Sequence, residues 1–104
     1  MAVKVNGDNF ENEVLNTDKP VLADFYSDSC IPCKMLSPVL SQIENEYTDK
    51  IKVVKINTNF NTELVDKYEI QAAPTLVFFK DGNEIERLRG FVNKEEIIDI
   101  ILNF

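Results

Sequence analysis

The chain has 104 residues, 44% of them hydrophobic and 10% aromatic, which is enough apolar material for one core and argues against intrinsic disorder. This length fits a single domain over residues 1–104. A net charge of -7 disfavours binding to nucleic acid or to an anionic membrane. No segment approaches the roughly 18 apolar residues of a membrane helix, and the polar start resembles no export signal. We therefore expect a soluble, cytoplasmic protein without membrane contacts.

Short apolar runs alternate with segments of helical periodicity along most of the chain. Apolar runs of four to eight residues indicate strands, and apolar residues that recur every three or four positions indicate helices packed on one face. In chain order we expect a strand at residues 3–5, a helix that begins at Asp8 or Asn9 and carries Phe10 and Val14, and a strand at 21–26. A helix that ends near residue 48, a strand at 51–56 and a short helix at 62–68 follow. Strands at 75–80 and 84–89 and a last helix capped by Asn93 complete the chain.

This order is β-α-β-α-β-α-β-β-α. Strands that alternate with helices pair in parallel through crossover connections, whereas the last two strands, joined by the tight turn Asp81-Gly82, must be antiparallel. The sequence therefore predicts an α/β protein with a mixed sheet covered by helices.

The two cysteines, Cys30 and Cys33, lie between the strand at 21–26 and the helix that follows it, and the chain contains no histidine. With Pro32 in the first helical turn, both sulfurs are expected at a helix N-terminus, where free N–H groups and the helix dipole stabilise a thiolate. Residues three apart in such a turn are close enough to form a disulfide. We therefore expect redox cycling, with Cys30 as the more exposed nucleophile and Cys33 as the resolving thiol.

Three other uses of a cysteine pair compete with redox chemistry. A structural disulfide that closes so short a loop contributes only about 2 kcal/mol, against roughly 4 to 5 for a long loop. A zinc site needs four ligands, so two cysteines would have to be shared between subunits. Haem attachment requires a histidine where this chain has Lys34. Redox function is favoured and no cofactor or metal is expected, while inert or metal-bridging cysteines remain alternatives.

Several separate stretches of the sequence resemble the thioredoxin family. They are Phe10 in its acidic helix, Val21-Leu22-Ala23-Asp24-Phe25-Tyr26, Cys30-Ile31-Pro32-Cys33-Lys34-Met35, Pro38, Lys55-Ile56-Asn57, Ala73-Pro74-Thr75-Leu76, Asp81-Gly82 and Gly90. These stretches follow the family order across nearly the whole chain. The resemblance implies the thioredoxin fold, with the cysteines at the end of a central strand, and reduction of protein disulfides through Cys30 and Cys33.

A carboxylate in a buried strand, such as Asp24, should have a raised pKa because the low dielectric disfavours its charged form. The resemblance places Asp24 behind the cysteines and near Lys55, where it takes the proton from Cys33. No histidine competes for that role. An Asp at a solvated strand edge is the alternative.

The resemblance also implies a surface that holds the substrate. Thioredoxins carry a cis proline at the position of Pro74, and the backbone of the preceding residue, Ala73, pairs with an extended substrate segment. Gly90 is expected to extend this surface because it has no side chain to block a close approach. Ile31 and Pro32, between the cysteines, complete the expected contacts.

The chain departs from the usual thioredoxin motif beside the first cysteine. Ser29 and Ile31 replace the common tryptophan and glycine, and Tyr26 replaces a second common tryptophan. Pro32 is retained, which in the family accompanies reducing behaviour. We expect a reductase that a thioredoxin-reductase type flavoprotein recycles. A disulfide isomerase or oxidant, or a binding module with little redox role, remain alternatives.

Overall fold

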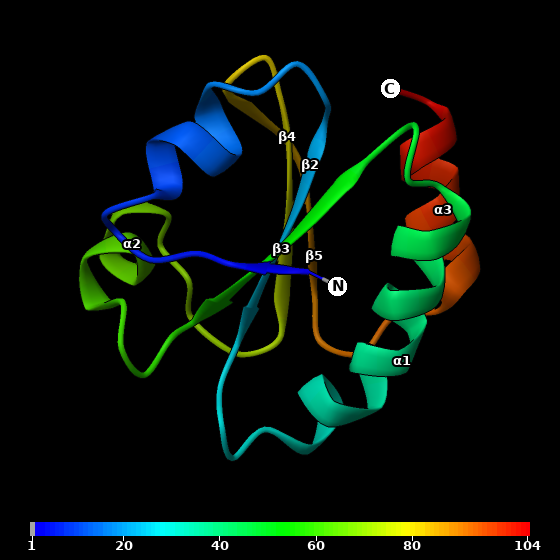
Figure 1. Ribbon diagram of the computed structural model, residues 1–104. Helices are drawn as coiled ribbons and strands as arrows, with labels where there is room; N and C mark the ends of the chain where they lie inside the picture. Colours follow the sequence, from blue (N-terminus) through cyan, green and yellow to red (C-terminus); the bar gives the residue numbers. More distant parts are fainter. Residues whose placement is uncertain (1) are drawn as a thin grey trace.

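In the computed structural model, which describes residues 2–104, one five-stranded sheet carries helices on both faces (Figure 1). The elements are β1 (Val3–Lys4), the π-helical turn η1 (Glu11–Leu15), β2 (Val21–Tyr26), α1 (Ile31–Glu46), β3 (Lys52–Asn57), α2 (Thr62–Lys67), β4 (Thr75–Lys80), β5 (Asn83–Arg89) and α3 (Lys94–Leu102). The strand order is β1-β3-β2-β4-β5, in which β2 is central, parallel to β3 and antiparallel to β4. The predicted mixed α/β sheet is confirmed.

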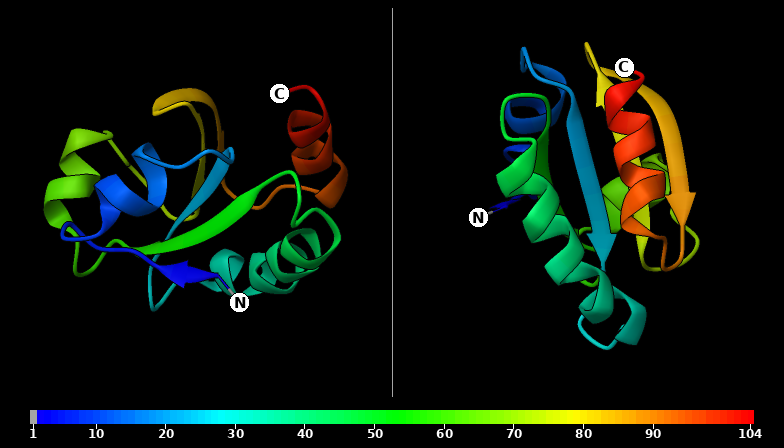
Figure 2. Two further views of the ribbon diagram at one scale, coloured as in Figure 1. Left: turned by 45° about the horizontal axis from the view of Figure 1, so that its top comes forward. Right: turned by 90° about the vertical axis from the view of Figure 1, so that its right-hand side faces the viewer.

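The side chains of the central strand β2 alternate between two apolar layers. Val21, Ala23 and Phe25 pack with residues of η1 and α2, whereas Leu22 packs with residues of α1 and α3. Figures 1 and 2 show α1 and α3 together on one face of the sheet, with η1 and α2 on the other. Because successive side chains of a strand point to opposite faces, Asp24 points to the same face as Leu22, toward α1.

The segment before β2 differs from the expected helix. Residues 11–15 form one π-helical turn, and neither Asp8 nor Asn9 caps it, so both predicted caps are wrong. The Asn9 Oδ1 instead accepts the backbone N–H of Asn6 at 2.7 Å. Phe10 occupies the N-cap position and is buried in the core. The burial of this ring, rather than a polar cap, fixes where the turn begins.

The hairpin predicted from the turn residues is confirmed, with β4 and β5 antiparallel. Asp81 and Gly82 both have positive φ, 52° and 80°, as the usual two-residue hairpin turn requires. Asn93 stands at the N-cap position of α3, although its side chain makes no capping hydrogen bond. Among residues 2–104, no helix combines the length and the apolar character needed to cross a membrane.

Candidate active site at the cysteine pair

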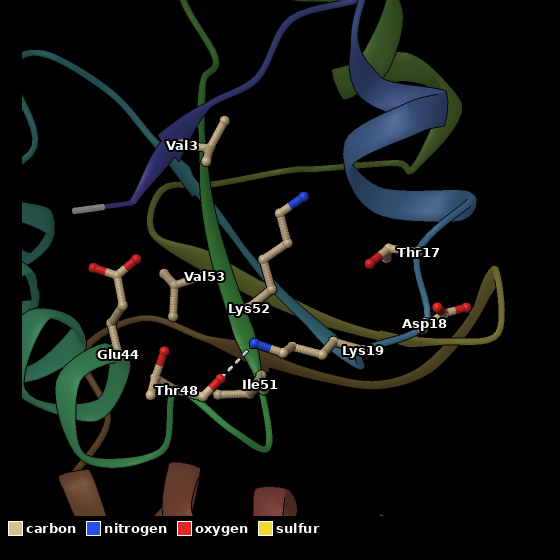
Figure 3. A pocket seen from close by; sticks show the side chains of 9 residues that line it. All are labelled: Val3, Thr17, Asp18, Lys19, Glu44, Thr48, Ile51, Lys52 and Val53. Atoms are coloured by element: carbon tan, nitrogen blue, oxygen red, sulfur yellow. Dashed lines mark hydrogen bonds between the residues drawn. The ribbon is translucent and has the colours of Figure 1, made fainter.

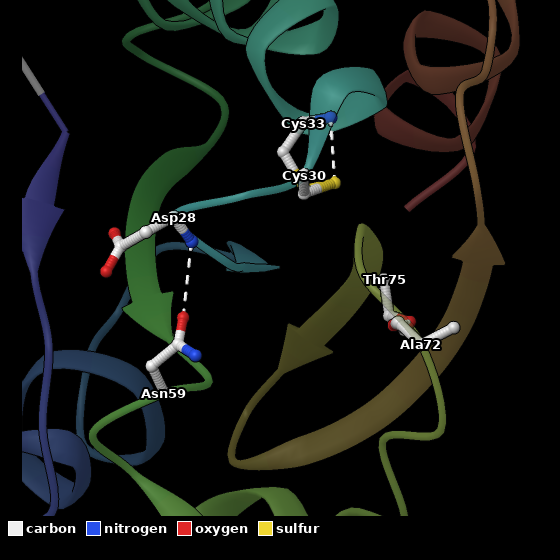
Figure 4. Close-up of a disulfide and its surroundings, with 6 residues drawn as sticks. All are labelled: Asp28, Cys30, Cys33, Asn59, Ala72 and Thr75. Atoms are coloured by element: carbon white, nitrogen blue, oxygen red, sulfur yellow. Dashed lines mark hydrogen bonds between the residues drawn. A yellow bond between two sulfur atoms is a disulfide. The ribbon is translucent and has the colours of Figure 1, made fainter.

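Cys30 and Cys33 are joined by a disulfide at the N-terminus of α1, with their Cα atoms 5.2 Å apart (Figure 4). Cys30 is the N-cap residue of the helix, and its Sγ accepts the backbone N–H of Cys33 at 3.1 Å. Pro32 lies in the first turn, where its missing N–H removes no helical bond. The sulfur of Cys30 therefore occupies the position at which free N–H groups and the helix dipole favour negative charge.

In the disulfide form the two cysteines are almost equally buried. The exposed fraction is 8% for Cys30 and 6% for Cys33. Cys30 is thus the more exposed of the two, as predicted, but only by a small margin in this oxidised state. What distinguishes Cys30 is its place at the helix cap.

Hydrogen bonds tie the loop before Cys30 to the end of β3. The backbone N–H of Asp28 donates to Asn59 Oδ1 at 3.2 Å (Figure 4), and Asn57 Nδ2 donates to Asp28 Oδ1 at 3.0 Å. The N–H of Asn59 in turn donates to Asn57 Oδ1 at 2.9 Å. The sequence analysis named Asn57 only within a stretch that resembles thioredoxins and assigned neither asparagine a role, although short amides at the end of a buried strand are a recognisable loop signal.

Asp24 is buried in the central strand with an exposed fraction of only 2%, which rules out the solvated strand edge. Its Oδ1 has no hydrogen-bond partner in the structure. Burial raises the pKa of Asp24 from 3.8 to about 6, and the positive charge of Lys55 opposes that rise. The raised pKa expected for this carboxyl is confirmed.

A pocket of about 210 Å³ connects Asp24 with the second cysteine. Its lining residues are Asp24, Tyr26, Ser27, Asp28, Cys33, Lys34, Ser37 and Lys55. It brings together Asp24, Lys55 and Cys33, as the resemblance to thioredoxins implied. Since a water molecule takes about 30 Å³ of liquid volume, the pocket has room for several.

Ser37 also lines this pocket, and sequence reasoning missed it. Its Oγ accepts a hydrogen bond from Lys55 Nζ at 3.1 Å. The signal was present in its spacing, because a residue four positions after Cys33 lies on the same face of the helix.

Pro74 lies beside the end of β2 that leads to the cysteines, since its neighbour Thr75 pairs with Phe25. The Ala73-Pro74 peptide bond is cis, as expected. The backbone N–H of Gly90 donates to the Pro74 carbonyl at 2.9 Å, so the structure brings these predicted site residues together.

Apolar side chains stand exposed around the cysteines and the Pro74 segment. Ile31 is 69% and Met35 57% exposed, one helical turn apart on α1, and Phe91, next to Gly90, is 47% exposed. Pro32 is exposed between the two cysteines. The start of α1 therefore presents an exposed apolar surface made by Ile31, Pro32 and Met35, with the exposed Lys34 beside it.

A larger cavity, of about 450 Å³, lies near the opposite end of the sheet, where β2 and β3 begin (Figure 3). Both of its lysines are engaged: Lys19 Nζ donates to the Thr48 carbonyl at 2.7 Å, and Lys52 pairs with Glu13 at 2.9 Å. Within residues 2–104, no three or more His, Cys, Asp or Glu side chains cluster in a way that could hold a metal ion, in this cavity or elsewhere.

A family model described as thioredoxin matches residues 1–103. The chain belongs to the thioredoxin family. It is 40% identical to a thioredoxin of Rickettsia bellii over 103 residues, which cover 99% of this chain and 98% of that one. It is 43% identical to thioredoxin 1 of a Nostoc species over 93 residues, 89% and 87% of the two chains.

A thioredoxin of the chloroplastic M type from Chlamydomonas reinhardtii is 40% identical to the chain over 100 residues, 96% of this chain and 71% of the relative. Thioredoxins exchange thiols and disulfides through paired cysteines of this kind. Because the chain belongs to this family and carries the Cys30–Cys33 pair, it is a thiol-disulfide oxidoreductase that reduces protein disulfides.

Proposed function

We propose that Cys30 is the attacking thiolate and Cys33 the resolving thiol. The observation that carries this assignment is the hydrogen bond from the Cys33 N–H to the Cys30 sulfur at the start of α1. In the first step, the Cys30 thiolate bonds to one sulfur of the substrate disulfide and the other leaves as a thiolate. In the second step, the Cys33 thiolate attacks the Cys30 sulfur and the remaining substrate sulfur leaves. The substrate gains two electrons and the Cys30–Cys33 disulfide forms.

Asp24 is the base for the second step in this proposal. Cys33 must lose its proton before it attacks, and both residues line one pocket. A pKa of about 6 leaves the Asp24 carboxylate ionised at neutral pH yet basic enough to accept a proton. Its unpartnered Oδ1 is available for that proton, directly or through water. Lys55 acts on Asp24 through its charge.

Ala73, Pro74 and Gly90 hold the substrate in this proposal. An extended substrate segment pairs with the backbone at Ala73, which is partly exposed and borders a cavity of about 290 Å³. Apart from Gly90 and its two chain neighbours, no residue has a heavy atom within 4 Å of the place where a Gly90 Cβ would be, so the surface next to Pro74 is open. Ile31 and Pro32 contact apolar groups of the substrate beside the reacting sulfurs.

The oxidised pair must be reduced again after each turnover. A thioredoxin-reductase type flavoprotein is the proposed electron donor, because the chain retains Pro32 and belongs to the family that such enzymes serve. The cytoplasm, where thiols are kept reduced, is the proposed compartment. Reduction by a purified flavoprotein reductase and NADPH tests the donor, and cell fractionation tests the compartment.

Insulin reduction by the wild type, Cys30→Ser and Cys33→Ser tests the assignment of the two cysteines. Both variants should lose turnover, and only Cys33→Ser should accumulate a mixed disulfide, because it keeps the attacking thiol. If the Cys30→Ser variant instead accumulated a mixed disulfide through Cys33, Cys33 would be the attacking thiol and Cys30 the resolving one. An insulin reduction rate that does not depend on either cysteine would support a binding module.

The reduction potential separates a reductase from an oxidant of the same fold. We expect a value near about -270 mV, whereas one near about -120 mV is typical of strong oxidants and would contradict the reductase assignment. Equilibration with glutathione buffers, followed by alkylation and mass measurement, gives this potential directly.

A further inference from the structure

The Lys55 side chain is held between α1 and β2 in the pocket behind Cys33. Its Nζ donates to Ser37 Oγ at 3.1 Å and lies 5.6 Å from the centroid of the Tyr26 ring. Lys55 is also the register partner of Asp24 on the neighbouring parallel strand, so the two side chains point to the same face of the sheet. None of the ion pairs within residues 2–104 joins Lys55 to Asp24.

The charge that acts on Asp24 comes from Lys55 and not from the other charged groups of the pocket. Asp28, in the loop after β2, and Lys34, on α1, also line the pocket, but both are exposed to solvent. On its other side Asp24 pairs with Leu76 of β4, which is uncharged. Lys55 is the one charge that shifts the pKa of Asp24, in opposition to burial. The position of this ammonium therefore moderates how far burial raises the pKa of Asp24.

We propose that Ser37 is a positioning residue that draws the Lys55 ammonium toward α1 and keeps it from forming a direct ion pair with Asp24. This inference rests on the proposed role of Asp24 as the base for Cys33. A half-buried ammonium that loses its hydroxyl acceptor turns to an unsatisfied acceptor in the same pocket, and the Oδ1 of Asp24 is such an atom. Ser37 thus preserves the basicity of Asp24 while Lys55 stays close enough to moderate it.

The test is the Ser37→Ala variant, which removes the acceptor and suits a helix interior better than serine does. Carbon-13 NMR of the oxidised protein follows the Asp24 carboxyl directly. We expect the pKa of Asp24 to fall below about 6 by on the order of one unit, as a closer opposite charge requires. The acid limb of the pH profile of insulin reduction should move in the same direction. Ser37→Thr, which keeps the hydroxyl, should restore the wild-type titration.

Two further variants make the test specific. Ser41→Ala is the matched control, because Ser41 is exposed one helical turn further along α1, and it should leave the Asp24 titration unchanged. In a Lys55→Met background, Ser37→Ala should have no effect, since the cation that it releases is gone. An unchanged or raised Asp24 pKa in Ser37→Ala, or an equal shift without Lys55, would overturn the proposal.

The NMR and kinetic readouts separate this proposal from the role of Asp24 in catalysis. If the Asp24 titration shifts in Ser37→Ala while the pH profile of the reaction stays in place, then Ser37 positions Lys55 but Asp24 is not the base. If the carboxyl titration itself does not move, the positioning role fails regardless of the kinetics.

Discussion

Gly90 donates its backbone N–H to the carbonyl of Pro74 at 2.9 Å, which joins the residue after β5 to the residue before β4. This bond satisfies the Pro74 carbonyl within the chain and closes the β4–β5 hairpin at the end that faces the cysteine loop. Gly90 adopts a φ of 78° to make it, a left-handed conformation that favours glycine.

Gly90→Ala should lower the free energy of unfolding by about 1–2 kcal/mol, because a Cβ is disfavoured at positive φ. Steric overlap contributes little, since no residue beyond the two chain neighbours has a heavy atom within 4 Å of the point that the new Cβ would occupy. Urea denaturation measures the change. Gly7→Ala is the matched control, because Gly7 is also surrounded by open space and has no such φ. Equal stability of the two variants would contradict the role of the backbone conformation.

Asp24→Asn should stabilise the fold at pH 7 by up to about 3 kcal/mol, which is the equivalent of a pKa raised from 3.8 to about 6. The folded state binds the Asp24 proton more tightly than the unfolded state does. Stability of the wild type therefore falls as the pH rises through the window from 3.8 to about 6 and stays lowered above it.

Urea denaturation of wild type and Asp24→Asn at several pH values checks this sign. The advantage of the variant should be present at pH 7 and disappear below about pH 3.8, where the carboxyl is protonated in both states. A stability difference that does not depend on pH would mean that packing, and not the buried charge, distinguishes the two side chains.

The same Asp24→Asn variant should slow the resolving step at pH 7 by roughly tenfold to a hundredfold, at or below the low end of what a general base contributes. Stopped-flow measurement of a preformed mixed disulfide on Cys30 isolates the attack by Cys33 from the first exchange. The difference in rate between the variant and the wild type should become smaller as the pH rises, because hydroxide then deprotonates Cys33 without the Asp24 carboxylate. A rate equal to wild type across the pH range would remove Asp24 from the mechanism.

Ile31→Ala should raise the KM for protein disulfides by about fivefold, which corresponds to roughly 1 kcal/mol of lost apolar contact. Stability should change little, because Ile31 is 69% exposed. Leu102→Ala is the control: Leu102 is 57% exposed at the far end of α3, away from the cysteines. Steady-state insulin reduction measures KM, and an equal effect of both substitutions would argue against a contact at Ile31.

The sheet and the main catalytic candidates could be predicted from the sequence because local patterns determine them. A run of buried residues gives β2, and a lone carboxylate within it marks Asp24 as unusual before any contact is known. The positions of Cys30 and Pro32 follow from helix-start preferences. These features depend on residues that are close together in the chain.

The rest of the site depends on how distant segments meet. The Lys55–Ser37 hydrogen bond spans 18 residues and requires both the register of β3 against β2 and the rotation of α1 above them. The hydrogen bond between Asn57 and Asp28 joins residues that are 29 positions apart in the sequence. It requires the end of β3 to lie beside the loop that follows β2. The π-helical turn was missed because tertiary burial of Phe10, and not local capping preference, decides its form.

The sulfur of Cys30 has two roles: it caps the N-terminus of α1, and it is the proposed nucleophile. A variant that is inactive but keeps the helix cap is therefore the most useful one. Serine is a strong N-cap residue, so Cys30→Ser keeps an acceptor for the Cys33 N–H while it abolishes thiol chemistry. Alanine removes both and costs about 1 kcal/mol of helix stability. Of these two variants, only Cys30→Ser therefore gives a protein that has lost thiol chemistry but keeps the helix start, so that partner binding can be measured on an intact surface.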